Sequence, residues 1–336
     1  MHVRGYRGVL LSGLTVLALF GCETREPAAS SPRARYVLET KWFWAEVVGN
    51  EHGGPGSGGG LNGIAALVPR DSGSNIFVPA LSGLNFEHIW LEGVAPSPLE
   101  PRRYPTTINQ KGSKVILSWD ETSYSRITAR ISFSVREPSY LEQSVEITAH
   151  HRFAGDDQPN SIALLFASYM EQPDDPHLYV RPNGIDGESL KGWYGVTTAT
   201  ARDQDYLLRP LPERRLDGVA DHLVAMKEHD VVDLVGESGK PLRLKDLPLY
   251  FYYGHLHRDL VFLQMFKQPE RARFLYNLDG GDLGGDIPKP NPAWDYILLH
   301  PDIEVGKTYR WDTCLVVKPF QGREDILREV RSYITR

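Results

Sequence analysis

The sequence predicts an all-β protein, a large antiparallel β-sandwich (supersandwich) with a short C-terminal helix. About 14 short runs are rich in β-branched and aromatic residues and are separated by turn-forming Gly, Pro and Asn. Two of these runs, 126–135 and 140–149, alternate apolar and polar residues with a period of two, which is typical of an antiparallel hairpin with one buried face. Strands do not alternate with helices along the chain, so we expect no parallel sheet.

The strands are expected in the following order. Residues 36–48 (YVLETKWFWAEVV) predict a first long strand, because this run is aromatic and β-branched. Further strands are expected at 62–68, 75–78, 114–119, 126–135, 140–149, 162–170, 249–257, 260–266, 272–278, 296–300 and 307–318. Residues 171–245 are polar and rich in proline, which indicates long loops that leave the sheet. Near the C-terminus, apolar residues from Ile326 to Ile334 recur at helical spacing and predict an amphipathic helix that covers the sheet.

The N-terminal residues predict export. Residues 1–21 form a signal peptide, with Arg4 and Arg7 before an apolar core of about a dozen residues. That core is too short for a helix that crosses a hydrocarbon layer of about 30 Å. It ends in Leu-Phe-Gly-Cys, which resembles the bacterial lipobox and implies a lipid on Cys22. An ordinary secretory signal with a chance cysteine is the alternative, since Phe20 is bulky for its place.

We therefore expect three parts and one location. Residues 22–35 are small, polar and Pro-containing and predict a flexible tether, and 36–336 are expected to form a single β-sandwich domain. The lipid on Cys22 would anchor the protein to a membrane of the cell envelope, facing the periplasm or the exterior.

Charge and cysteine content exclude several classes. Without residues 1–21 the chain has 35 basic and 43 acidic residues, a net charge of −8, and no long block of like charge, so nucleic acid is not expected as a partner. With Cys22 lipidated, Cys314 is the remaining thiol, which excludes a disulfide framework and a cysteine metal site. The Gly-rich stretch 49–60 lacks a GK[ST] ending, so we expect a surface loop or a lid, and no cofactor.

The densest group of reactive side chains lies in residues 78–102. Asn85, Glu87 and His88 fall within four positions. An imidazole, whose ordinary pKa is near 6.5, beside a carboxylate is the usual acid–base pair for opening or hydrolysing a sugar acetal. Neighbouring strand residues point to opposite faces, so Glu87 and His88 share a cleft only if the chain turns near Gly83. The alternative is a core histidine bonded to backbone, with Glu87 paired to Arg102.

A second polar group, Glu100-Pro101-Arg102, follows a Pro-rich loop. Proline favours extended backbone at Glu100, so both charged side chains can emerge on one face. Either they form an ion pair that holds the loop, or Arg102 binds a substrate carboxylate such as that of a uronic acid with its planar fork. His88, Glu87 and Glu100 are thus the catalytic candidates, and Arg102 and Asn85 are binding candidates.

Two later groups complete the candidates. Asn291, Trp294 and Asp295 follow a Gly-rich loop, and an indole can stack on a sugar while amides and carboxylates bond its hydroxyls, although Trp294 is equally suited to the core. His255 is placed near this site. His255 and His257 also share one face of a strand, which would suit a metal ion, but no third ligand can be assigned, so no metal is expected.

Several motifs carry a family resemblance. FVPALSGLNFEHIW (77–90), EPRRYP (100–105), FYYGHL (251–256), NPAWDY (291–296) and PDIEVGKTYRW (301–311) resemble a family of uncharacterised bacterial secreted proteins and lipoproteins of the galactose mutarotase-like (aldose epimerase-type) supersandwich. The resemblance implies this fold, which also serves glycoside hydrolases and polysaccharide lyases. True mutarotases use a histidine beside an aromatic-Asn-Leu motif and a late glutamate. Here residues 85–88 arrange those types differently, and Glu304 lies in an ordinary turn, so a reaction is not implied.

The leading hypothesis is a lipid-anchored envelope protein that binds a carbohydrate, including uronate-containing ones, and that in one version also acts on it as an epimerase, lyase or glycoside hydrolase-like enzyme. The first alternative is a non-catalytic structural or interaction lipoprotein, which predicts that His88 and Glu100 are buried in structural networks. The second is a metal-dependent hydrolase that uses His255 and His257.

Overall fold

The computed structural model describes residues 36–50, 61–91, 100–102, 104–122, 124–155, 157–181, 194–196, 248–277, 280–281 and 289–336. All of them fall in one compact unit, Ala34–Arg336. Outside the described residues lie the expected signal peptide, Cys22, the tether up to residue 35, and most of the Gly-rich loop and of the polar stretch 171–245.

Strands make up most of the regular secondary structure in the described part of the chain. They are β1 (Tyr36–Glu39), β2 (Phe43–Val48), β3 (Gly63–Pro69), β4 (Asn85–Leu91), β5 (Thr107–Lys111), β6 (Lys114–Trp119), β7 (Ile127–Arg136), β8 (Tyr140–Ala149), β9 (Ile162–Ala167), β10 (Leu178–Val180), β11 (Tyr194–Val196), β12 (Phe251–His255), β13 (Leu260–Phe266), β14 (Ala272–Asn277), β15 (Ala293–His300) and β16 (Thr308–Pro319). A short 3-10 helix, η2 (Pro269–Arg271), and an α-helix, α3 (Arg323–Thr335), are the described helices. Neither of these is long and apolar enough to cross a membrane.

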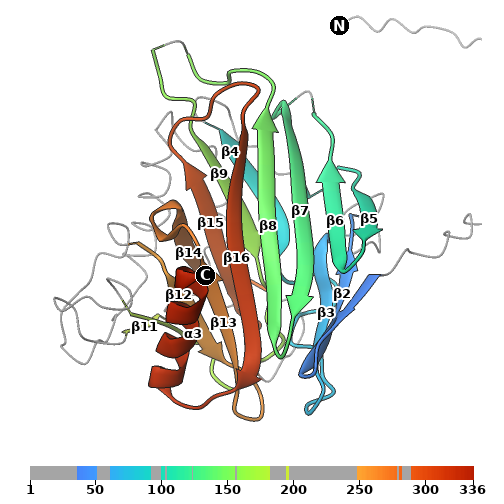
Figure 1. Ribbon diagram of the computed structural model, residues 1–336, viewed down its shortest axis with the longest axis vertical. Helices are drawn as coiled ribbons and strands as arrows, with labels where there is room; N and C mark the ends of the chain where they lie inside the picture. Colours follow the sequence, from blue (N-terminus) through green and yellow to red (C-terminus); the bar gives the residue numbers. More distant parts are fainter. Residues whose placement is uncertain are drawn as a thin grey trace, which may run out of the picture. The chain divides into compact units, whose positions relative to one another are not determined.

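The described strands form three antiparallel sheets (Figure 1). The largest has the order β11-β10-β12-β13-β16-β8-β7-β6-β5, a second has β14-β15-β9-β4, and a third has β1-β2-β3. The four-stranded sheet is built from segments far apart in sequence, since β9 pairs with β4 on one side and with β15 on the other. This confirms the predicted antiparallel sandwich.

Two of the predicted strands are corrected by the structure. The expected long strand 36–48 is a hairpin of β1 and β2, because the Thr40 hydroxyl accepts hydrogen bonds from the backbone N–H groups of Trp42 (3.2 Å) and Phe43 (3.1 Å) and turns the chain. The expected strand 75–78 is a single bridge, Phe77 to Met170. The predicted hairpin at 126–149 is confirmed as β7 and β8.

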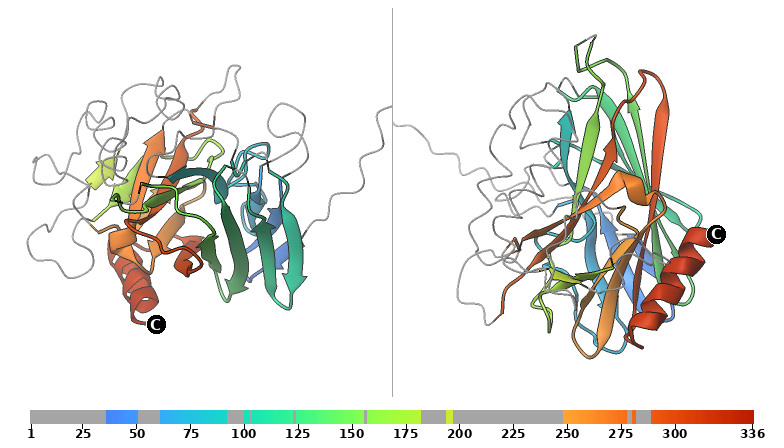
Figure 2. Two further views of the ribbon diagram at one scale, coloured as in Figure 1. Left: turned by 90° about the horizontal axis from the view of Figure 1, so that it is seen from above. Right: turned by 90° about the vertical axis from the view of Figure 1, so that its left-hand side faces the viewer.

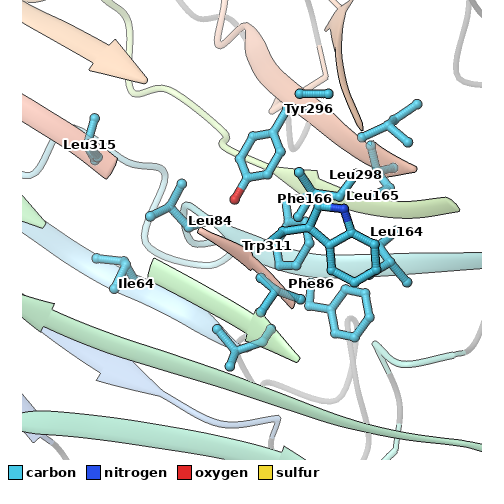
Figure 3. Packing of buried hydrophobic residues seen from close by; sticks show 14 of the residues in the cluster. Ile64, Leu84, Phe86, Leu164, Leu165, Phe166, Tyr296, Leu298, Trp311 and Leu315 are labelled. Atoms are coloured by element: carbon cyan, nitrogen blue, oxygen red, sulfur yellow. The ribbon is translucent and has the colours of Figure 1, made fainter. Parts of the chain in front are cut away.

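Apolar packing joins the sheets. Phe86 of β4, Phe166 of β9 and Tyr296 of β15 stack in sequence in the main core, with ring centroids 5.0 and 5.1 Å apart (Figure 3). Burial of each such side chain contributes about 1.5–3 kcal/mol. These three rings fix which face of the four-stranded sheet is the inner one.

The predicted C-terminal helix is confirmed as α3. Its buried residues Ile326, Leu327, Val330 and Tyr333 pack in a second cluster with Phe251, Tyr253, Val261, Leu263, Met265, Cys314 and Val316 of the nine-stranded sheet. Neighbours of these strand residues, such as Tyr252 and Phe262, belong to the main core, so α3 covers the outer face of that sheet (Figures 1 and 2).

Candidate functional site

The polar group at Glu87 and His88 is positioned by a β-bulge in β4. Phe86 pairs with Phe166 of β9, and His88, not Glu87, pairs with the next residue, Leu165. Glu87 is therefore an extra residue that opposes no partner, and a bulge of this kind redirects side chains. Glu87 Oε1 and His88 Nε2 lie 3.3 Å apart. The two side chains thus meet, which the sequence allowed only if the chain departed from simple alternation.

The chain does turn near Gly83, where Ser82 and Leu84 have φ values of 65° and 48°, but the bulge at Glu87 is what brings the two side chains together. A side chain at Gly83 would place its Cβ 2.2 Å from the ring of Phe77, so the glycine allows close packing. Asn62 flanks the bulge instead. Its amide nitrogen donates to the Phe86 carbonyl (3.0 Å), and its amide oxygen accepts from the Phe86 N–H (2.9 Å). The side chain of Asn62 therefore takes the place of a neighbouring strand.

The site lies on the outer face of the four-stranded sheet. Phe86, Phe166 and Tyr296 point into the main core, so the adjacent residues Asn85 and Asp295 point away from it. These outward residues are nevertheless buried, with side chains less than a tenth exposed. The face is therefore covered, and polar groups on it need partners.

Arg102 and Tyr169 provide partners for Glu87. Arg102 Nη2 lies 2.5 Å from Glu87 Oε1, and the Tyr169 hydroxyl donates to Glu87 Oε2 at 2.6 Å. The same hydroxyl accepts from Arg102 Nη2 at 2.6 Å. Three segments, β4, residues 100–102 and the stretch after β9, are joined in this way.

The neighbours of Glu87 and Tyr169 determine the protonation states of these two side chains. Burial alone would raise the pKa of Glu87, but the guanidinium of Arg102 and the hydrogen bonds with His88 and Tyr169 outweigh it, and its pKa falls to about 2. Burial and the Glu87 charge raise the pKa of Tyr169 well above its ordinary value. At neutral pH Glu87 is an anion and Tyr169 a neutral donor. Glu87 is therefore a positioning group and cannot serve as the proton donor that the sequence suggested.

Asp295 lies beside this group. Its Oδ1 accepts a hydrogen bond from the backbone N–H of Ser168 at 3.0 Å. Burial lowers the pKa of Arg102, but the negative charges of Glu87 and Asp295 raise it overall. The site thus holds two carboxyl groups near one guanidinium.

Asn85 is the unusual member of the face. Its side chain is fully buried, and neither its amide nitrogen nor its amide oxygen has a hydrogen-bond partner among the described residues. Buried polar side chains are nearly always bonded, and one left unbonded costs about 1–3 kcal/mol. Asn85 stands two positions before Glu87 on the same strand. A buried donor and a buried acceptor without hydrogen bonds to other described residues therefore lie near the ion pair.

Glu100 does not join this group. Its Oε1 accepts hydrogen bonds from the hydroxyls of Thr122 and Ser125, each at 2.5 Å, and the side chain is buried. In the described part of the chain Arg102 pairs with Glu87 and not with Glu100. The expected shared face of Glu100 and Arg102 is therefore not used, and Glu100 anchors its loop.

Trp294 lies in the core between the sheets. It is fully buried, its ring meets Phe262 edge-on with centroids 5.6 Å apart, and its Nε1–H donates to the Pro176 carbonyl at 3.1 Å. Trp294 follows the parity of Tyr296 on β15, so it faces inward while Asp295 faces outward. The core alternative for Trp294 is the one that the structure has.

Asn291 holds two loops together. Its amide oxygen accepts from the backbone N–H of Gln172 at 3.0 Å, and its amide nitrogen donates to the Gly281 carbonyl at 3.5 Å. Asn291 therefore has a structural role in the loop that leads into β15.

The two histidines of the metal alternative have other partners. His255 lies on the outer face of the nine-stranded sheet, in ring contact with Tyr253 and Phe320, and so on the opposite side of the sandwich from Glu87. His257 pairs with Asp174, Nδ1 to Oδ1, at 2.9 Å. Within the described ranges there is no group of three or more His, Cys, Asp or Glu residues that could hold a metal ion.

Sequence reasoning missed Tyr169 and Asn62. Tyr169 lies two positions beyond Ala167 in the apolar run, so alternation could have placed it on the outer face, but nothing in the sequence links it to Glu87. Asn62 precedes Gly63 as a turn dipeptide, and its bonds to Phe86 span 24 positions. Contacts over such separations depend on sheet register.

Comparisons with known proteins give fold relatives at low similarity. No family model matches the chain, and no curated protein matches it. Similar solved structures include a GalM/aldose epimerase homologue from C. elegans (10% identity, TM-score 0.44, 86% of this chain and 100% of that chain), an alpha-N-acetylgalactosaminidase from Bifidobacterium bifidum (7%, 0.49, 89% and 38%) and a heparan sulfate lyase from Pedobacter heparinus (7%, 0.39, 88% and 38%). The first is of the aldose epimerase type that the sequence resembles. The chain spans about two fifths of the other two proteins. At these identities and scores, function has to be argued from this chain's own residues.

Proposed function

We propose that this protein binds a neutral carbohydrate at the outer face of the four-stranded sheet, beside Asn85, Glu87 and His88. The observation that carries the proposal is the buried side chain of Asn85, whose donor and acceptor are both unpartnered among the described residues. A sugar hydroxyl is at once a donor and an acceptor, so adjacent hydroxyls of one ring can satisfy both amide atoms.

His88 supplies a second polar contact of fixed orientation. Glu87 is an anion and can only accept, so His88 Nε2, which lies 3.3 Å from Glu87 Oε1, carries a proton. The ring is thereby held in one tautomer when it is neutral, and Nδ1 is left as an acceptor. Such prior orientation lowers the entropy lost when a ligand binds.

The charges favour a neutral ligand over the uronic acid that the sequence suggested. Arg102 is already paired with Glu87 at 2.5 Å, and Asp295 lies nearby. A ligand carboxylate would therefore meet two protein carboxyl groups for one guanidinium, and would have to compete with the buried carboxylate of Glu87 for Arg102.

The proposal is for binding without a chemical step. Acid–base chemistry on a sugar needs a proton donor and a proton acceptor whose pKa values lie near the working pH. Glu87, with a pKa of about 2, cannot be the donor at neutral pH. Glu100 is engaged by Thr122 and Ser125 in a separate network. Of the three catalytic candidates from the sequence, His88, Glu87 and Glu100, His88 is the one that remains.

A second candidate function is a scaffold for protein contacts in the cell envelope. Its specific support is that His88 and Glu100 are both buried in polar networks, which is what that alternative expects. On this account the Glu87–Arg102 pair only ties loops together. The unpartnered Asn85 favours the carbohydrate proposal over it.

We also propose that the protein is held in the envelope by a lipid on Cys22. This part rests on the sequence, in which an apolar core of signal length ends at Gly21-Cys22. A tethered sandwich would present its ligand site to the space outside the cytoplasm.

Binding of the purified full-length protein to a glycan array, followed by titration calorimetry, tests the proposal. We expect neutral glycans to bind, uronates of the same size to bind no more tightly, and Glu100→Gln to bind as the wild type does. An array that retains no neutral glycan, or a variant at Glu100 that abolishes binding, would contradict it.

A further inference from the structure

A separate pocket of about 340 Å³ lies at the tip of the β12–β13 hairpin. Three segments form it, residues 72–76, residues 171–174 and the hairpin tip at 256–260. Ile76, Leu256 and Leu260 are buried and give it an apolar floor. The volume is at the lower end of the range for small-molecule sites. None of these residues belongs to the proposed carbohydrate site.

Two opposite charges on the walls of this pocket are not paired with each other. Glu171 and Arg258 both line it, and no ion pair joins them in the described part of the structure. Glu171 accepts one long hydrogen bond from Gln172, at 3.4 Å. Arg258 uses one nitrogen, Nη1, to donate to the Asp71 carbonyl at 2.7 Å, so most of its five donors stay open.

The other charged residues of the pocket are already engaged. Asp174 Oδ1 pairs with His257 Nδ1 at 2.9 Å and with Lys289 Nζ at 3.1 Å. Hydrogen bonds from His257 and Lys289 hold the pKa of Asp174 below its ordinary value. Glu171 and Arg258 are thus the anion and the cation that a ligand can reach.

The backbone at the tip is unfavourable for the residues that it carries. Arg258 and Asp259 have φ values of 57° and 55°, and they lie in a three-residue loop, 257–259, that is closed by the Leu256 N–H to Leu260 carbonyl bond at 2.8 Å and the Leu260 N–H to His257 carbonyl bond at 3.3 Å. Glycine, asparagine and aspartate tolerate the left-handed region, and arginine is a poor residue for it. Strained positions of this kind concentrate at ligand sites. The strain therefore points to a use for the Arg258 side chain that turn stability does not explain.

We propose that this pocket binds a small zwitterion, a free amino acid or a short peptide, with its carboxylate on Arg258 and its ammonium on Glu171. The guanidinium fork matches a carboxylate, and Glu171 matches a cation. The apolar floor accommodates the carbon chain between the two charges.

Calorimetric titration of the full-length protein with free L-amino acids and dipeptides tests the proposal. We expect binding of at least one zwitterion, and a loss of affinity of roughly tenfold or more when its carboxylate is esterified or its amine is acetylated. Failure of every zwitterion to bind, or equal binding of the esterified or acetylated probe, would overturn it. A probe that binds through its ammonium alone would mark the pocket as a cation site and would also overturn it.

Two variants of the turn separate ligand binding from stability. Arg258→Asn suits the left-handed backbone better, so we expect a higher melting temperature together with lost binding. Asp259→Gly relieves the same turn and keeps the guanidinium, so it should also raise the melting temperature but leave binding unchanged. Retained binding in Arg258→Asn, or lost binding in a folded Asp259→Gly protein, would refute the assignment.

Discussion

Arg102 Nη2 lies 2.5 Å from Glu87 Oε1, and this pair of a partly exposed arginine and a buried glutamate lies on the face of the four-stranded sheet that points away from the main core. A β-bulge at Glu87 brings His88 to the same face as Glu87, and the Tyr169 hydroxyl bridges both partners of the pair. It fixes Glu87 as an anion, orients His88 and occupies Arg102. The account of the site as a binder of neutral ligands follows from this one contact.

Removal of Arg102 should cost more stability than removal of the whole pair. Arg102→Met leaves the Glu87 carboxylate buried without a cation, and we expect a loss of about 3–5 kcal/mol in the free energy of unfolding. The double variant Glu87→Gln/Arg102→Met should recover most of that loss. Urea denaturation at pH 7 measures both. Equal losses in the single and double variants would show that the charge of Glu87 is not what Arg102 compensates.

The pH dependence of stability should carry the signature of Glu87. Its folded pKa of about 2 lies below its ordinary value of 4.5, so its contribution is complete above 4.5 and is lost as the pH falls through 2. The shift corresponds to about 3 kcal/mol. The difference in unfolding free energy between the wild type and Glu87→Gln should shrink by about that amount between pH 6 and pH 2. A difference that stays constant over this range would contradict the low pKa.

Trp294 should matter for stability and not for the ligand. We expect Trp294→Phe to lose about 2 kcal/mol because it empties core volume and removes the Nε1–H bond to Pro176. Gly254→Ala disturbs the same ring by crowding it, because the new Cβ would lie 2.3 Å from the Trp294 ring. We expect this change to cost about 1–3 kcal/mol. Thermal unfolding and sugar titration check both. A changed sugar affinity in either folded variant would show that Trp294 takes part in ligand binding.

Cys22→Ser should release the protein from the membrane fraction. Without the thiol no lipid can be attached, and the apolar core of the signal is too short to anchor the chain. Fractionation and labelling with a radioactive fatty acid measure the effect. A labelled Cys22→Ser protein, or a wild type without label, would argue for an ordinary secretory signal.

The sequence predicted the fold well because alternation is a local property. The hairpin of β7 and β8 follows from every second residue of 126–149, and α3 follows from five apolar residues at helical spacing. The misjudged strand 36–48 failed at a single residue, Thr40, whose hydroxyl turns the chain. The sequence alone does not distinguish this threonine from the many threonines that lie within strands.

The cluster of side chains around Glu87 was predicted in part. Asn85, Glu87, His88 and Arg102 were found together because they are dense in sequence, and Asp295 was found beside the motif around Trp294. The sequence could not show that an extra residue in β4 reverses the parity at His88, or which of Trp294 and Asp295 faces the core. Both depend on register between strands that are far apart in the chain.

Asn85→Leu tests the central claim most directly. Leucine has a similar size and needs no hydrogen bonds, so if the amide is kept for a ligand, the variant should gain about 1 kcal/mol or more in unfolding free energy and lose binding of neutral oligosaccharides of glucose, galactose and N-acetylglucosamine. Thermal unfolding and calorimetric titration of the same two proteins measure both quantities. A variant that is less stable than the wild type and binds these sugars as well as it does would contradict the account.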